Sequence, residues 1–350
     1  MDEHLKFGII VPVYKIPYDM LRECYSSLAS QSYHNIEICF VDDASPDNCG
    51  AICDEFSRQD NRVKVIHQPV NQGVSAARNI AIQQIDCDYI TFVDADDWVD
   101  QDYVLNVAKW LETNGTDYEL VICRQMMNYE DASVSLDNIE TEKRCETRAD
   151  IEQLQIMAIS SAIKDVPTSA ASIDNVAAKY ISRKVLHEHS VLFRDIPYRE
   201  DGLFFQEVCE WVNKVAVLPV GFYHYRARTD SAVNQYRPKA PEEMSRLVIY
   251  MVDFAKHYSK GTLYTQRLNV FKLIPVQMAI STFFYNPSNP VKGIRRHKQC
   301  VAYLKTEPFA DMQKGIRLNE LKRNAVVKVV LLRLHLYKAI YILRHIINQR

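Results

Sequence analysis

Short apolar runs alternate with amphipathic segments along the first third of the chain. The apolar runs predict buried strands at residues 7–13, 36–41, 63–66, 89–93 and 118–123. Between them, apolar residues recur at helical spacing, which predicts helices at residues 18–31, 47–58, 74–85 and 100–112. Strands that are apolar on both faces and alternate with helices predict an α/β fold with a mainly parallel sheet flanked by helices.

The pattern is less regular after residue 123. Residues 124–147 are polar and predict irregular structure. The helices and short strands predicted beyond them are 148–163, 175–188, 200–211, 215–218 and 222–225. From about residue 238 helical spacing dominates, broken at Asn286–Pro290. We therefore predict two halves of one α/β domain, 1–115 and 116–236, followed by a helical C-terminal region, 237–350.

Composition narrows the function classes. The net charge of −2 gives no reason to expect nucleic acid as a partner. Glycine is scarce, with nine in the chain, and neither a P-loop nor a glycine-rich dinucleotide turn occurs. The nine cysteines are scattered and predict free thiols rather than a disulfide framework. The polar, acidic N-terminus does not resemble a signal peptide, so we expect a cytoplasmic site.

Three carboxylates follow the predicted strand 89–93 directly. Asp94, Asp96 and Asp97 lie within four residues, where like charges repel and each costs free energy to desolvate. A divalent cation offsets both costs and prefers carboxylate oxygens. The run therefore predicts a metal site for a phosphorylated substrate.

Three further motifs are expected at the same edge of the sheet. They are Val11-Pro12-Val13-Tyr14, Val41-Asp42-Asp43-Ala44-Ser45, and the stretch from Asn71 through Gly73 to Arg78-Asn79. Ligands of open α/β sheets bind at the carboxyl ends of the strands, so these motifs fit a nucleotide diphosphate. Each also has a structural reading: an Asp pair can cap a helix, Gly73 can relax a loop, and Arg78 can pair with a surface carboxylate.

Together the motifs resemble the nucleotide-binding half of family 2 glycosyltransferases, which have the GT-A fold. The resemblance extends more thinly through Ala178-Lys179-Tyr180, Tyr198-Arg199-Glu200-Asp201 and Phe222-Tyr223-His224-Tyr225-Arg226, about two thirds of the chain. Ala44 and Ala81 stand where the family usually has glycine. Both are small, so we expect the backbone path to be kept.

The resemblance assigns roles to the donor side of the site. It implies that Asp94 and Asp96 hold ribose and a divalent metal, Mn²⁺ or Mg²⁺, with Asp96 as the direct ligand. Ala95 would contact the donor, and Asp97 would either support the site or contact the donor sugar. Asp42 or Asp43 would contact the base with Arg78 nearby, and Pro12, Val13 and Tyr14 would line the base pocket beside Gly73.

The pair Glu200-Asp201 begins a predicted helix. Acidic residues also favour helix N-termini because of the helix dipole, so a purely structural role is equally consistent with the residues. The resemblance implies that Asp201 is the catalytic base, which accepts the proton of an attacking acceptor hydroxyl, and that Glu200 orients the acceptor. Attack opposite the departing diphosphate would invert the anomeric centre.

Two further groups have alternative readings. The resemblance implies that His224 completes the metal shell, whereas a histidine in an aromatic strand is more often a packed core residue. Arg226 and Arg228 would either neutralise the diphosphate or face solvent.

The basic segment 317–350 also leaves alternatives open. Its charges spread around a single helix, which argues against a transmembrane span, because each charge costs about 2.5–3.5 kcal/mol at the bilayer centre. The segment fits peripheral contact with the cytoplasmic face of a membrane, or packing on the catalytic domain or on a second subunit in a homodimer.

These predictions combine into an inverting glycosyltransferase that uses a UDP-sugar. Its acceptor would be a saccharide or lipid-linked saccharide in cell-surface polysaccharide or glycoconjugate synthesis. The alternatives are a nucleotidyltransferase, for which no basic triphosphate-binding loop is found near the first strand, and a non-catalytic nucleotide-sugar-binding subunit. The sequence does not identify the sugar.

Overall fold

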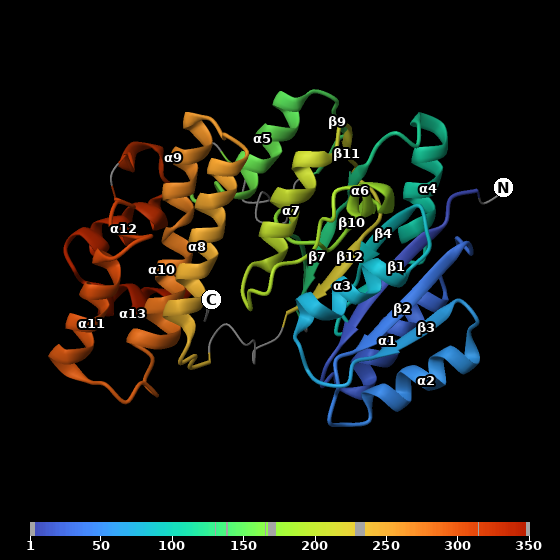
Figure 1. Cartoon of the computed structure of the whole chain (residues 1–350), viewed down its shortest axis with the longest axis horizontal. Coiled ribbons are helices and arrows are strands. Elements are labelled where there is room, and N and C mark those ends of the chain that lie inside the picture. Colours follow the sequence, from blue (N-terminus) through green and yellow to red (C-terminus); the bar gives the residue numbers. More distant parts are fainter. Residues whose placement is uncertain are drawn as a thin grey trace. The chain divides into compact units, whose positions relative to one another are not determined.

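The computed structural model describes residues 4–129, 131–137, 139–164, 166, 173–227, 235–313 and 315–347. The chain forms two compact units (Figure 1). The first unit comprises Met1–Gln155, Ala171–Asp195 and Glu200–Ala227, and the second comprises Ile156–Ala170, Ile196–Arg199 and Arg228–Arg350. Each unit is described by itself.

The first unit contains an eight-stranded sheet with the order β3-β2-β1-β4-β10-β6-β11-β9. The strands are β1 (Phe7–Val13), β2 (Ile36–Asp42), β3 (Val63–His67), β4 (Tyr89–Phe92), β6 (Leu120–Ile122), β9 (Lys143–Cys145), β10 (Lys179–Ser182) and β11 (Val215–Val217). Strands β1 to β4 are mutually parallel, and so are β6 and β11. The mixed α/β sheet confirms the predicted fold class.

Seven helices begin among the described residues of this unit. They are α1 (Tyr18–Ala29), α2 (Cys49–Gln59), α3 (Val74–Gln84), α4 (Tyr103–Asn114), α5 (Arg148–Ala158), α6 (Arg183–Glu188) and α7 (Glu200–Trp211). On β1, alternate residues from Phe7 to Val13 share one core with buried side chains of α1, α2 and α4. Each large side chain buried there contributes roughly 1.5–3 kcal/mol. The other face is close to α3, because a Cβ on Gly8 would lie 2.5 Å from Ile85.

A small second sheet lies beside the carboxylate run. Its order is β5 (Trp98–Val99), β12 (Tyr223–Arg226), β7 (Gln125–Asn128) and β8 (Ser133–Ser135). Strand β12 pairs antiparallel with β5, which sets His224 opposite Trp98. This pairing brings residues 223–226 next to a loop more than a hundred positions earlier in the chain.

Two predictions about this unit are wrong. The helix predicted at 175–188 is instead β10 followed by the short helix α6, and β10 lies antiparallel between β4 and β6. Lys179, Tyr180 and Ile181 are buried in the middle of the sheet. The apolar run here is short, and the spacing of apolar residues in so short a run does not distinguish a buried strand from a helix. The stretch 124–147, predicted to be irregular, contains β7, β8 and β9. Strands β7 and β9 pair with β12 and β11, which are remote in sequence, and β8 pairs with the neighbouring β7.

The second unit is helical in its described part. It contains α8 (Ala240–His257), α9 (Thr262–Phe271), α10 (Leu273–Ala279), the π-helical turn η3 (Ile280–Phe284), α11 (Gly293–Lys305), the 3₁₀ turn η4 (Leu318–Glu320), α12 (Arg323–Arg333) and α13 (Tyr337–Ile347). The continuous basic helix predicted beyond residue 317 is therefore wrong, since α12 and α13 are separated at Leu334–Leu336, where His335 has φ 56°. None of the helices in the described residues is both long and apolar enough to cross a bilayer.

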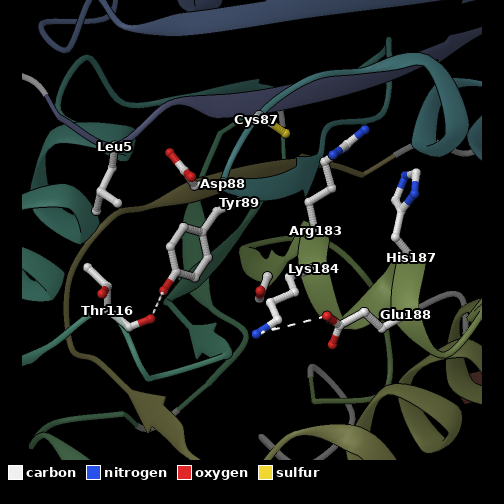
Figure 2. Close-up of a pocket in the computed structure, with 10 residues that line it drawn as sticks. Leu5, Cys87, Asp88, Tyr89, Thr116, Arg183, Lys184, His187 and Glu188 are labelled. Atoms are coloured by element: carbon white, nitrogen blue, oxygen red, sulfur yellow. Dashed lines mark hydrogen bonds and ion pairs between the residues drawn. The ribbon is translucent and has the colours of Figure 1, made fainter.

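A cavity of about 460 Å³ opens at the amino ends of the parallel strands (Figure 2). Its lining includes Leu5 before β1, Cys87 and Asp88 before β4, and Arg183 and His187 of α6. None of the predicted site residues lines it. The carboxylate run follows the opposite end of β4.

Candidate active site

The carboxyl ends of β1, β2 and β4 meet at one edge of the sheet. Val13 pairs with Asp42 at the ends of β1 and β2, and the N–H of Val93 donates to the carbonyl of Ile10 at 3.0 Å. The N–H of Asp43 donates to the carbonyl of Val13 at 2.9 Å. The predicted motifs at the ends of these three strands are thus neighbours. Val13 and Ala95 are buried, whereas Tyr14 is 40% exposed and Pro12 is half-buried.

Asp43 organises the loop that precedes α3. Its Oδ1 accepts hydrogen bonds from Gln68 Nε2 at 2.7 Å and from the Gln72 N–H at 2.8 Å, and its Oδ2 accepts one from the Gly73 N–H at 2.8 Å. Gly73 has φ 88°, a conformation that favours glycine. Asp43 therefore fixes the path of the chain into α3, and its side chain is buried.

Asp42 has different partners. Its Oδ1 accepts from the Ser45 N–H at 3.0 Å, and its Oδ2 lies 3.2 Å from His67 Nδ1. Hydrogen bonds to Asp42 and Asp54 raise the pKa of His67. His67 was not singled out in the sequence, where it directly follows the predicted strand 63–66; in the structure it is the last residue of β3.

The substitution of glycine by Ala44 keeps the backbone path at a cost. Ala44 has φ 54°, in the left-handed region, where a residue with a Cβ is disfavoured by about 1–2 kcal/mol. The loop after β2 therefore holds Ala44 in a conformation that glycine would adopt more easily.

The loop 94–97 is anchored to β12. The N–H of Asp94 donates to the Tyr223 hydroxyl at 3.0 Å, and that hydroxyl donates to Asp97 Oδ2 at 2.6 Å. The Arg226 N–H donates to Asp97 Oδ1 at 2.8 Å. Burial, followed by the charges of Asp94 and Asp96, raises the pKa of Asp97 to about 8. Asp97 is therefore a buried support of the loop, and Tyr223 is a partner that sequence reasoning did not single out.

Arg78 lies at the centre of the cluster. Its Nη2 donates to Asp94 Oδ1 at 2.9 Å, and its Nη1 lies 2.5 Å from Asp201 Oδ1 and 3.2 Å from Glu200 Oε1. The guanidinium also lies 5.1 Å from the ring centroid of Phe193. Burial by itself would lower the pKa of Arg78, but the three carboxylates raise it above its ordinary value. Arg78 is thus a buried cation shared by three acids, not the partner of a surface carboxylate.

Glu200 and Asp201 begin α7 and reach this cluster from the other half of the unit. Burial, followed by the charge of Asp201, raises the pKa of Glu200 to about 8, although Arg78 opposes the shift. The raised pKa favours the protonated form of Glu200, whereas Asp201 has the shorter bond to the guanidinium. The structure joins the carboxylates after β4 to an acidic pair more than a hundred residues later.

Lys179 is a second buried cation in this region. Its Nζ donates to Asn175 Oδ1 at 3.3 Å and to the Ala177 carbonyl at 3.4 Å. Burial lowers the pKa of Lys179 to about 7, while the charges of Asp201, Cys209, Cys123 and Asp137 act in the opposite direction. The sequence contained this residue only as part of a family motif.

The predicted metal set of Asp94, Asp96 and His224 is not assembled. The ring of His224 stacks on Trp98 with centroids 5.1 Å apart, its Nε2 lies 2.9 Å from Asp100 Oδ1, and its Nδ1 lies 3.3 Å from Asn128 Nδ2. In the part of the chain that the structure describes, no three His, Cys, Asp or Glu side chains form a group that could hold a metal ion. His224 is therefore placed as a packed strand residue, which is the alternative reading of its motif.

Asp94 nevertheless lies among like charges whose repulsion a bound cation would reduce. Partial burial and the charges of Asp201 and Asp96 raise the pKa of Asp94, against the opposing charge of Arg78. Crowded carboxylate oxygens of this kind suit Mn²⁺ or Mg²⁺. Asp94 and Asp96 thus fit a cation whose other ligands come from outside the protein.

Arg226 is partly buried, and its guanidinium bonds Glu23 and the backbone of the loop 94–97 rather than the carboxylate of Asp94. Its Nη2 lies 2.6 Å from Glu23 Oε2, its Nε donates to the Asp96 carbonyl at 2.8 Å, and its guanidinium lies 4.5 Å from the Trp98 ring centroid. It therefore braces the loop 94–97. Arg228 lies outside the described residues.

Comparison with known proteins agrees with this arrangement. Residues 8–160 match the family described as Glycosyl transferase family 2. EpsH of Bacillus subtilis, a protein named as a glycosyltransferase, is 30% identical over 75% of this chain and 73% of its own length. A poly(ribitol-phosphate) beta-glucosyltransferase of Bacillus spizizenii is 34% identical over 33% of this chain and 19% of its own length.

Among solved structures, TarS of S. aureus in complex with UDP-GlcNAc has the same fold. It superposes with a TM-score of 0.63 at 17% identity, covering 96% of this chain and 89% of that chain. At this identity the likeness concerns the fold alone.

Proposed function

Since the chain belongs to glycosyl transferase family 2 and is a glycosyltransferase, we propose that it is an inverting enzyme that moves a sugar from a UDP-sugar to an acceptor hydroxyl. Family membership argues against the nucleotidyltransferase and the non-catalytic binding subunit. The UDP donor is supported by the fold shared with TarS, which has been solved with UDP-GlcNAc.

One observation carries the proposal. The Arg78 guanidinium bonds Asp94 on the donor edge and both Glu200 and Asp201 at the start of α7. A sugar whose diphosphate lies against the loop 94–97 would therefore have its anomeric carbon close to the acidic pair. Pro12, Val13, Tyr14, Asp42, Asp43 and Gly73 would shape the base pocket at the same edge.

Glu200 and Asp201 would have different roles in proton transfer. Glu200, whose raised pKa favours its protonated form, would donate a hydrogen bond to the acceptor or to Asp201. Asp201, whose Oδ1 is bonded by Arg78, is the carboxylate that accepts the proton of the attacking hydroxyl. Attack from the side of Asp201, opposite the leaving diphosphate, inverts the anomeric centre.

A divalent cation completes the proposed donor site. Asp96, with Asp94, would hold it. When bound, Mn²⁺ or Mg²⁺ neutralises charge on the leaving nucleotide diphosphate. Asp97 and Arg226 keep the loop in place, and Arg78 holds Asp94 beside the acidic pair.

The acceptor is proposed more broadly. The relative named for poly(ribitol-phosphate) glucosyl transfer supports a polyol-phosphate or saccharide acceptor in cell-surface polymer synthesis. Peripheral membrane contact would suit a lipid-linked acceptor.

The test is UDP release from a panel of UDP-sugars with Mn²⁺ and candidate acceptors. Wild-type protein should release UDP, and Asp201→Asn should retain UDP-sugar binding by calorimetry while transfer falls by about 10²–10⁴-fold. Glu207→Gln on the same helix, which removes the charge paired with Arg194, is the matched control and should transfer normally. Normal transfer by Asp201→Asn would remove Asp201 as the base, and pyrophosphate released from a nucleoside triphosphate would contradict sugar transfer altogether.

A further inference from the structure

Helix α12 is apolar on two opposite faces. Ala325, Val329 and Leu332 are buried in the core of the second unit. Positions 323, 327, 330 and 334 share the opposite face because their spacing follows the helical repeat. Val327, Val330 and Leu334 on that face are 45%, 38% and 60% exposed.

Two further exposed apolar residues follow α12 in the sequence. Leu336 in the connection is 49% exposed, and Ile342 on α13 is 44% exposed. Isolated exposed apolar residues are ordinary, but several on one helical hairpin indicate an interaction surface. We call Val327, Val330, Leu334, Leu336 and Ile342 the hairpin surface.

The charged residues of the segment that carries this surface have one sign. Residues 321–347 contain Lys322, Arg323, Lys328, Arg333, Lys338 and Arg344 and no Asp or Glu. Arg323, Arg333 and Lys338 are exposed. The chain as a whole has a net charge of −2, so the positive charge is a local property of the hairpin.

We propose that the hairpin surface binds reversibly to the interface of a lipid bilayer that contains anionic lipids. Exposed Val and Leu side chains would enter the boundary between headgroups and acyl chains, and the long basic side chains would reach the phosphates. This inference does not depend on the donor or base assignments.

A second copy of the chain fits this surface less well. A symmetric dimer places the same patch against itself, so Arg323, Arg333 and Lys338 of the two copies would face one another. Residues 321–347 supply no acidic partner for them. An anionic lipid surface supplies the complementary charge directly.

The full chain should be sedimented with vesicles of phosphatidylcholine alone and of phosphatidylcholine with phosphatidylglycerol as roughly a third of the lipid. We expect binding to the anionic vesicles that weakens as salt is raised. Leu334→Ser/Leu336→Ser should bind the anionic vesicles at least about tenfold more weakly than wild type. Arg333→Gln/Lys338→Gln should lose part of the preference for anionic vesicles.

The matched control is Ile249→Ser/Leu263→Ser, which removes two apolar side chains that are each 45% exposed on α8 and α9. It should bind like wild type, and thermal unfolding should show that all variants are folded. Equal or absent binding of wild type to both kinds of vesicle would overturn the proposal, as would unchanged binding by Leu334→Ser/Leu336→Ser. The proposal would also be overturned if the wild-type chain formed a dimer that Leu334→Ser/Leu336→Ser dissociates and did not bind vesicles.

Discussion

Arg78 is the residue whose role changed most between sequence and structure. Its motif placed it near the donor edge, and the structure adds two bonds to residues 122 and 123 positions away. A buried guanidinium that bonds several acids has a planar fork of donors that lysine lacks. Its geometry therefore sets the distance between donor and base groups, in addition to supplying charge.

Arg78→Lys should keep one positive charge but lose the simultaneous bonds to Asp94 and the acidic pair. We expect kcat to fall by about 10²-fold or more, with a smaller change in KM for the UDP-sugar. Steady-state UDP release measures both parameters. Wild-type kcat in a folded Arg78→Lys variant would contradict a positioning role.

The burial of Lys179 predicts how the free energy of unfolding depends on pH. Its pKa is about 7 in the folded protein and has the ordinary value of 10.5 when unfolded. The cost of burying the cation is therefore fully present below pH 7, and the free energy of unfolding rises as pH increases from about 7 to 10.5.

Lys179→Met removes this cost. The gain in unfolding free energy should be larger at pH 6 than at pH 9 by about 3 kcal/mol, from the two pH units over which the folded protein alone is deprotonated. Denaturant unfolding at the two pH values measures the difference. A gain independent of pH would show that Lys179 is not the titrating group.

At the level of elements, the sequence predicted those strands and helices that local apolar spacing defines, and the sheet edge at which polar motifs follow the strands. The strands β1 to β4, the helices between them and the carboxyl edge are where the apolar runs placed them. Strand β10 was missed because its position between β4 and β6 depends on partners remote in sequence. The anchoring of the loop 94–97 by Tyr223 was missed for the same reason, since strand pairing creates that contact.

The loop 68–73 is a second element held by one side chain. Asp43→Ala should remove three hydrogen bonds to this loop and lower the free energy of unfolding by about 2–4 kcal/mol. If Gly73 and the start of α3 shape the donor pocket, KM for the UDP-sugar should rise more than kcat falls.

Asp47→Ala is the control for this variant. Asp47 is exposed and accepts a hydrogen bond from the Cys49 N–H at 3.1 Å. Asp47→Ala should lower the free energy of unfolding by about 1 kcal/mol or less. Equal losses for the two variants would show that the Asp43 network has no special role.

For the whole molecule, the three tryptophans provide a selective reporter. Trp98, Trp110 and Trp211 all belong to the first unit, which contains the candidate active site. Their fluorescence therefore follows the unfolding of that unit.

UDP with Mn²⁺ should raise the tryptophan-detected stability by about 2.7 kcal/mol at a ligand concentration of 100 Kd. EDTA should remove most of this gain, and Asp96→Ala should show little of it. A gain that persists undiminished in EDTA and in Asp96→Ala would contradict the metal assignment.

The distribution of thiols has a practical consequence. All nine cysteines are free, eight are buried, and Cys87 alone is partly exposed, at the cavity beyond the amino ends of the strands. Burial raises the pKa of Cys87 to about 12, so a maleimide should react slowly and best at alkaline pH. A dye or a surface tether attached there would sit at the sheet edge opposite the carboxylates, which makes the unmodified protein suitable for single-site labelling and oriented immobilisation.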